Sequence, residues 1–399
     1  MNTGSVVYAT RKDPRNRRAQ FLVFGSPLIG AEEIEEVVAT LKSGWIGKGP
    51  RVAEFEEMMA LYTGAKHAIA VSSCTAALHL SLLALGIGDG DEVITTPMTF
   101  AATANAILHA GARPVFADVD LATMLIEPRE IERAITPRTK AIVPVHLAGR
   151  PCRMDEIGAI ARKHGLYIIE DAAHCIEGEY KSRHVGSIGD LTCFSFYVTK
   201  NVTTVEGGMV TTSNKKWAEK IRVLAMHGMD QDAFRRFQGA EYKHYEVVAP
   251  GYKYNMTDFQ AALGVHQLRR VESCLRRREE IWNYYASAFF DLPVRLPARD
   301  EARTRHARHL YTLLVHEPDC GKSRDEVLAG LMQRNIGVGV HYRPVHLHPY
   351  YRQTFGFKPG AYPNSEWIGE RTVSLPLSAR LSNEDVDDVV EAVRDTLAA

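Results

Sequence analysis

The sequence predicts a large α/β domain built on a mostly parallel sheet and a smaller second domain, and three observations support this. From about residue 66, short β-branched runs alternate with amphipathic stretches of helical period. At 399 residues, the chain exceeds what one compact domain usually holds. After Leu292-Pro293 the pattern changes to a separate α+β unit. We therefore expect a mobile tail at 1–20, a large domain at 21–288 and a small C-terminal α+β domain at 289–399.

The elements of the large domain follow in order. The expected strands are His67–Ser72, Glu92–Thr96, Pro114–Asp118, Ala141–Val145, Tyr167–Glu170, Cys193–Tyr197 and Met209–Thr212. The expected helices between them are Thr75–Leu85, Ala101–Ala110 and Met154–His164, the last closed by Gly165. In the small domain we expect strands near Leu310–His316 and Val338–His341, and helices near Ser323–Asn335 and Asn383–Thr396.

A long helix is expected from Thr257 to about Ala286, with a basic middle made of Arg269, Arg270, Arg276, Arg277 and Arg278. Charge runs on long helices usually form solvated faces or interface rims, so we expect that here rather than a nucleic-acid site. Lys plus Arg and Asp plus Glu both number 48, and the zero formal charge gives no overall field toward nucleic acid or an anionic membrane.

The six cysteines are scattered without a C-x-x-C pair, which favours a reducing, cytoplasmic setting. Residues 1–20 contain several basic side chains but no apolar core of a signal peptide. No uninterrupted apolar run approaches the roughly 18 residues that a membrane span needs. We expect a protein that is not embedded in a membrane.

Asp171 follows the apolar run Leu166–Ile169, at the carboxyl end of an expected buried strand. Ligands of open α/β sheets bind at that edge. Lys200 follows another apolar strand and precedes the pair Gly207-Gly208; near an apolar interior its ammonium form is disfavoured, and its neutral amine becomes a nucleophile toward an aldehyde. Taken singly, Asp171 can equally cap a turn and Lys200 can be a solvated loop residue. Together they form the combination that makes pyridoxal phosphate (PLP) an electron sink.

Ser72 to Ala77 joins an expected strand to a helix start, where free N–H groups and the positive helix end suit a phosphate. A simple helix cap is equally compatible, and the P-loop pattern is absent. Phe100, at another strand end, is either a ring that stacks on a cofactor or a core residue. The cluster His341 to His348 matches no standard zinc spacing, so we expect no metal site.

Combined in this order, the motifs resemble the DegT/DnrJ/EryC1/StrS family of sugar aminotransferases, whose fold is the aspartate aminotransferase-like fold type I. The likeness begins near residue 22 and rests on Ser43–Ile46, Ser72–His79, Asp91–Thr95, Glu170–His174, Ser195–Lys200, Glu206–Gly208 and Gly251–Asn255. Pro250–Asn255 and Gly337–Arg352 resemble the branch that aminates C4 of UDP-linked 4-keto sugars, as in the synthesis of UDP-4-amino-4-deoxy-L-arabinose.

The resemblance implies roles for particular residues. Lys200 would carry PLP as a Schiff base, Asp171 would pair with the pyridine nitrogen, Phe100 would stack on the ring and His174 would lie beside it. Cys74, Thr75 and Ser195 would surround the phosphate. Asn255 would reach the cofactor of the neighbouring subunit in a homodimer, although this chain has Lys253-Tyr254-Asn255 where many members have Asn-Tyr-Arg, so Lys253 is an alternative contact.

We further expect Lys48, His341 and Arg343 to contact the substrate. Lys48 replaces a threonine common in the family, and Val205 replaces a small residue before Glu206. The implied reaction is transamination from L-glutamate to a nucleotide-linked keto sugar. Two alternatives stay open: a PLP-dependent sugar dehydratase, whose members have His where this chain has Lys200, and a non-catalytic regulatory relative of the same fold.

Overall fold

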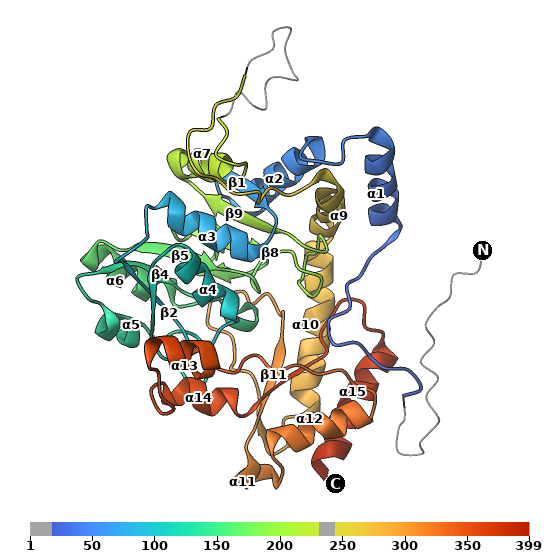
Figure 1. Ribbon diagram of the computed structural model, residues 1–399. Helices are drawn as coiled ribbons and strands as arrows, with labels where there is room; N and C mark the ends of the chain where they lie inside the picture. The colour runs from blue at the N-terminus through green and yellow to red at the C-terminus, as the bar shows by residue number, and fades with distance from the viewer. Residues whose placement is uncertain (1–17, 231–243, 399) are drawn as a thin grey trace.

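The computed structural model describes residues 18–230 and 244–398. Its main feature is a seven-stranded sheet with strand order β1-β9-β8-β5-β4-β2-β3 (Figure 1). The strands are β1 His67–Val71, β9 Gly208–Thr212, β8 Leu191–Ser195, β5 Tyr167–Asp171, β4 Thr139–Val143, β2 Glu92–Thr95 and β3 Arg113–Phe116. Neighbours from β8 to β3 run parallel, and β9 is antiparallel to both β1 and β8. The predicted mostly parallel α/β fold is confirmed.

Helices cover both faces of the sheet because successive strand residues point to opposite sides. In β1, Ile69 and Val71 belong to a core with residues of α3 (Cys74–Ala84) and α7 (Lys215–Leu224). Ala68 and Ala70 belong to a second core with residues of α2 (Pro50–Thr63) and α9 (Asp258–Arg269). A sheet buried on both faces explains why its strands are nearly continuous apolar runs.

Further helices complete this region. They are α1 Ala31–Ser43, α4 Ala101–His109, α5 Pro128–Ala134 and α6 Met154–His164, with the short turn η1 Leu147–Gly149. The short strands β6 Glu179–Tyr180 and β7 Arg183–His184 form a separate hairpin. The sequence pattern did not reveal α1, α2, α5 or α7, whereas the bounds predicted for α6 are those of the structure.

A separate hydrophobic core surrounds a three-stranded antiparallel sheet of β10 Val294–Arg295, β11 Tyr311–Val315 and β12 Thr372–Leu375. Residues of α10 (Val271–Ala288), α12 (Arg324–Gln333) and α15 (Asn383–Ala398) pack there. The remaining elements are α11 Glu317–Cys320, η2 Val345–Leu347, α13 Pro349–Phe355 and α14 Pro363–Gly369. In Figure 1 this region lies below the large sheet. The domain boundary at 288/289 stays a prediction.

Two predictions about secondary structure are wrong. The single helix expected from Thr257 divides at Arg270, whose φ and ψ of −108° and 6° are not helical, into α9 and α10. The strand expected at Val338–His341 is only an isolated bridge between Gly339 and Ser374.

The termini fall partly outside the described residues. The tail expected at 1–20 lies outside them up to residue 17. Arg18, within them, forms ion pairs with Asp385 (2.6 Å) and Asp388 (2.8 Å) of α15. Among the helices of residues 18–230 and 244–398, none has the length and apolar character needed to cross a membrane.

Candidate active site

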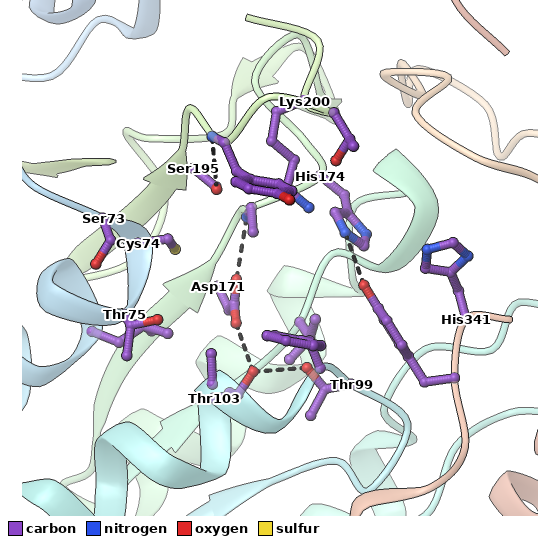
Figure 2. A pocket seen from close by; sticks show the side chains of 18 of the residues that line it. Ser73, Cys74, Thr75, Thr99, Thr103, Asp171, His174, Ser195, Lys200 and His341 are labelled. Carbon is purple, nitrogen blue, oxygen red and sulfur yellow. Dashed lines mark hydrogen bonds between the residues drawn. The ribbon is translucent and has the colours of Figure 1, made fainter. Parts of the chain in front are cut away.

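A cavity of about 550 Å³ opens at the carboxyl ends of β5 and β8 and beside the first turns of α3 and α4. Figure 2 shows side chains from these separate elements pointing toward one space. Eight residues that the sequence singled out line it: Cys74, Thr75, Phe100, Asp171, His174, Ser195, Lys200 and His341. The edge of the sheet predicted to bind ligands is therefore the edge that carries the cavity.

Asp171 ends β5 and is buried, with 5% of its surface exposed. The hydroxyl of Thr103 donates to its Oδ2 (2.8 Å), and the N–H of Ala173 donates to its Oδ1 (3.2 Å). Burial raises the pKa of Asp171, while Thr103, Ala173 and the nearby Lys200 act in the opposite direction. A carboxylate in this setting gains from a cationic partner in the cavity.

Lys200 lies in the turn after β8, where its N–H donates to the carbonyl of Tyr197 (2.9 Å). Burial lowers the pKa of Lys200 to about 8, against a smaller opposing effect of Cys74 and Asp171. An ordinary lysine has a pKa of ~10.4, so a much larger fraction of the Lys200 amine than of an ordinary lysine amine is neutral at physiological pH. A neutral amine is the form that attacks an aldehyde.

The first turn of α3 lies at the cavity and is capped by its own sequence. The Ser73 side chain caps this helix by accepting from the N–H of Ala76 (3.1 Å). Gly208 of β9 lies close to the residue that caps α3: a Cβ at position 208 would lie 2.4 Å from the carbonyl carbon of Ser73, so only glycine fits there. A helix start with its polar N–H groups beside a cavity is suited to an anion.

His174 contacts the turn that contains Ala148 and Gly149, whose φ angles are both positive, at 59° and 99°. The N–H of Ala148 donates to Nδ1 of His174 (3.2 Å), which assigns the imidazole proton to Nε2. That nitrogen faces the hydroxyl of Tyr342 at 3.3 Å. Burial, helped by Lys200, His309 and His341, lowers the pKa of His174 well below its ordinary value, so the ring stays neutral.

Tyr342 and Thr103 line the cavity but were missed in the sequence. The ring of Tyr342 lies 6.0 Å from that of Phe100, and burial raises the pKa of its hydroxyl, with a smaller effect of Asp171. Its position next to His341 was the available signal. Thr103 offered none, because a threonine inside a helix is common.

Three predicted site residues do not line the cavity. Arg343 is exposed and donates to the carbonyl of Leu347 (3.3 Å). Lys48 lies near Glu56, Arg222 and Lys253, and burial lowers its pKa. Asn255 pairs with Val71 in an isolated bridge, and its side chain donates to the carbonyl of Met256 (3.0 Å). The roles expected for these three residues stay predictions.

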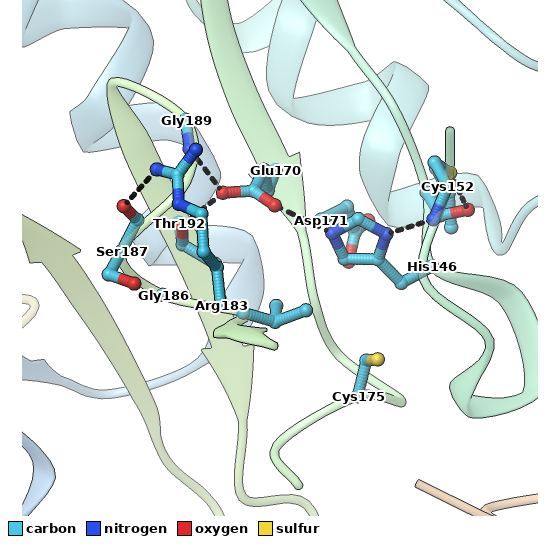
Figure 3. A network of polar contacts seen from close by, with 12 residues as sticks. His146, Cys152, Glu170, Asp171, Cys175, Arg183, Gly186, Ser187, Gly189 and Thr192 are labelled. Carbon is cyan, nitrogen blue, oxygen red and sulfur yellow. Dashed lines mark hydrogen bonds and ion pairs between the residues drawn. The ribbon is translucent and has the colours of Figure 1, made fainter. Parts of the chain in front are cut away.

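Glu170, the neighbour of Asp171 in β5, belongs to a polar network shown in Figure 3. Its carboxylate accepts from Nε2 of His146 (2.9 Å), the N–H of Gly189 (2.7 Å) and the hydroxyl of Thr192 (2.8 Å). These bonds hold the pKa of Glu170 below its ordinary value, although burial opposes them. The network connects β5 to β8 and to the loop before β8.

The residues present fit PLP. Three features surround one cavity: Lys200 with its lowered pKa, the buried carboxylate of Asp171, and the start of α3, where Gly208 lies close to Ser73. The size of the cavity is typical of small-molecule sites. The chemistry of these three features suits the aldehyde, ring nitrogen and phosphate of the cofactor, in that order. No group of three metal-ligating side chains occurs within the described part of the chain.

Comparisons with known proteins agree with this chemistry. The chain is 54% identical over 380 residues to SpsC, a spore coat polysaccharide biosynthesis protein of Bacillus subtilis, covering 95% of this chain and 98% of SpsC. Spr1654 of Streptococcus pneumoniae, a candidate sugar aminotransferase, is 35% identical in its PLP form, with a TM-score of 0.87 and coverage of 95% and 99%.

The pyridoxamine phosphate (PMP) form of Spr1654 is 36% identical to this chain, with a TM-score of 0.89, and the match covers 94% of this chain and 99% of Spr1654. PseC of Helicobacter pylori, an aminotransferase involved in the biosynthesis of pseudoaminic acid, is 31% identical, with a TM-score of 0.87 and coverage of 95% and 100%. The profile of the DegT/DnrJ/EryC1/StrS aminotransferase family matches residues 27–394. The chain therefore belongs to the DegT/DnrJ/EryC1/StrS aminotransferase family and is a PLP-dependent transaminase.

Proposed function

We propose that this protein transfers an amino group from L-glutamate to a nucleotide-linked keto sugar, with C4 of a UDP-4-keto sugar as the favoured position. The observation that carries the proposal is the convergence of Lys200 and Asp171 on one open cavity. The involvement of SpsC in polysaccharide synthesis and of PseC in pseudoaminic acid synthesis supports a sugar as the amino acceptor.

In the proposed mechanism, bound PLP supplies an electron sink for the negative charge that develops on the carbon losing a proton. The neutral amine of Lys200 removes that proton in one half-reaction and returns a proton in the other. Asp171 would keep the ring nitrogen of the cofactor protonated, and Thr103 and Ala173 hold the two oxygens of Asp171 in place. Thr75 and Ser195 would hold the phosphate, and the neutral His174 would contact the ring.

We also propose a homodimer in which Asn255 serves the partner's site. The position of Asn255 in the structure supports this proposal, because Asn255 pairs with Val71 of β1 and does not line the cavity of its own subunit. Lys48 lies near Glu56, Arg222 and Lys253. Glu56 pairs with Arg222 at 2.6 Å, so the three cations still outnumber the carboxylate, and an excess of positive charge suits a phosphorylated ligand. His341, which lines the cavity, and Arg343 would contact the substrate.

A reducing compartment, the cytoplasm, is proposed for this reaction. All six cysteines lie within the described residues and are free thiols. Cys152, Cys175 and Cys193 are buried, where free cysteine behaves as a small apolar side chain.

The test is a panel of UDP-, dTDP- and GDP-linked 4-keto sugars incubated with L-glutamate and PLP, with products identified by mass spectrometry. The proposal expects a 4-amino sugar and 2-oxoglutarate in equal amounts with one nucleotide series strongly preferred. Loss of water without gain of nitrogen would show a dehydratase instead. Conversion of simple 2-oxo acids but of no nucleotide sugar would contradict the proposed acceptor.

A further inference from the structure

A buried ion pair that the mechanism above does not use contacts the residue next to Lys200. Arg278 of α10 is 2% exposed and Glu177 is fully buried, and Nη2 of the arginine donates to Oε1 of the carboxylate. The sequence grouped Arg278 with its neighbours as a solvated basic face, and for this residue that expectation is wrong. Buried ion pairs often add little stability compared with apolar residues of similar size. The other contacts of Glu177 therefore indicate what the pair does.

The second carboxylate oxygen of Glu177 accepts from Nδ2 of Asn201 (2.8 Å). Asn201 directly follows Lys200. The same amide nitrogen donates to the carbonyl of Ala307 (2.9 Å), and Oδ1 of Asn201 contacts Nδ1 of His309 at 2.9 Å. Because both nitrogen bonds end on pure acceptors, the amide can have only one orientation, and its oxygen must accept a hydrogen. The proton of His309 is therefore on Nδ1.

The chain of contacts reaches the site at two points. The first is Lys200, whose backbone is continuous with the anchored Asn201. The second is His174, since the His309 ring lies 4.4 Å from the His174 ring. Burial, together with Lys200, His341 and Arg278, lowers the pKa of His309 well below its ordinary value, so this ring also stays neutral. A single amide thus joins segments near residues 177, 201 and 307–309.

We propose that Glu177, whose charge Arg278 compensates, positions Lys200 by accepting a hydrogen bond from the side chain of Asn201, and that the same amide fixes the orientation of His309 beside His174. Glu177 is a positioning residue, since it does not line the cavity. The inference rests on the proposed role of Lys200 as the reacting amine. Without the Glu177 acceptor, the turn at 200–201 would loosen and water would reach an amine whose low pKa depends on burial.

Two double variants separate positioning from stability. Glu177→Gln/Arg278→Met keeps an oxygen that can accept from Asn201, whereas Glu177→Leu/Arg278→Met removes it. Both remove the ion pair completely, so neither leaves a buried unpaired charge, which would endanger folding. Arg276→Met is the matched control, because Arg276 is an exposed arginine of the same helix.

The measurements use cofactor-free protein. Modification of Lys200 by trinitrobenzenesulfonate is followed against pH by peptide mass spectrometry, and hydrogen exchange is measured for the peptide 196–204. Wild type, Arg276→Met and the Gln double variant should titrate near pH 8, in keeping with a pKa of about 8. The Leu double variant should titrate at higher pH and exchange roughly fivefold faster, the effect of losing one buried hydrogen bond.

Two results would overturn the inference: a Leu double variant that matches wild type in both measurements, or Gln and Leu double variants that change equally. Neither measurement involves a sugar, so a negative result in the nucleotide-sugar panel would leave this inference standing, and the reverse also holds.

Discussion

Thr103 of α4 donates its hydroxyl hydrogen to Oδ2 of Asp171 at the end of β5, over 2.8 Å. Thr99, one turn earlier in the sequence, lies 2.7 Å from the Thr103 oxygen, and since Thr103 uses its own hydrogen on Asp171, Thr99 is the donor to Thr103. Two hydroxyls therefore orient the carboxylate that faces the cavity (Figure 2).

Replacing Thr103 by Val keeps the shape of the side chain and removes this bond. We expect kcat to fall roughly tenfold, the effect of losing one hydrogen bond to a charged group, with little change in folding. Ser81→Ala is the control, because Ser81 is an equally buried helical hydroxyl that donates to the carbonyl of Ala77. Equal kcat values for Thr103→Val and the control would show that Thr103 does not orient Asp171.

Lys200 should be the residue that borohydride links to PLP. Among the described lysines, only Lys200 lines the cavity, and burial lowers its pKa to about 8. We expect the reduced, digested protein to carry the label on Lys200, and Lys200→Ala to lose roughly 10²- to 10⁴-fold in rate, as removal of a general acid–base group does. A label found on another lysine would exclude the assignment.

Asp171→Asn should stabilise the cofactor-free protein at pH 7 while abolishing most of the activity. The pKa of Asp171 is raised in the folded state, so ionisation costs stability as pH rises through that raised pKa. The difference in Tm between variant and wild type should vanish below about pH 3, where the carboxyl is protonated in both states, since the ordinary Asp pKa is ~3.9. Activity should fall at least ~100-fold, as expected when a preorganised electrostatic group is lost. A variant that is less stable at pH 7 would contradict this reasoning.

Glu170→Gln should have the opposite effect on stability, although Glu170 is the next residue along the strand. Its pKa is lowered in the folded state, so the carboxylate contributes stability above its ordinary pKa, and this stability is lost as pH falls through the lowered value. We expect a cost of about 1–3 kcal/mol at pH 7. Thermal unfolding of cofactor-free protein at pH 7 and at about pH 3, well below the ordinary Glu pKa of ~4.3, tests this. A cost independent of pH would mean that charge is not the cause.

Hybrid dimers formed by exchange of subunits between two variants should show whether Asn255 completes the active site of the partner subunit. If Asn255 serves the partner's cofactor, a hybrid of Lys200→Ala and Asn255→Ala chains has one site with both defects and one with neither. Activity of the mixture should then rise above that of either parent after exchange, as measured on hybrids verified by native mass spectrometry. Hybrids showing only the average of the two parents would assign Asn255 to its own subunit.

The sequence alone determined the order of strands and helices around the site. Apolar runs end at Asp171 and just before Lys200. The carboxyl ends of parallel strands meet at one sheet edge, so the convergence of these two residues followed from local pattern and chain topology. The phosphate-binding candidates Cys74 and Thr75 were found in the same way, because a strand followed by a helix start is a local signal.

Only the tertiary structure decided which distant residues complete the site. Tyr342 reaches His174 from the opposite end of the chain, and a basic run gave no sign that Arg278 is buried against Glu177 while Arg276 is exposed. The break at Arg270 and the missing strand at Val338–His341 are of the same kind. Local propensity depends on near neighbours in the sequence, whereas burial and hydrogen-bond partners depend on how distant segments pack, so these features were decided by the folded chain.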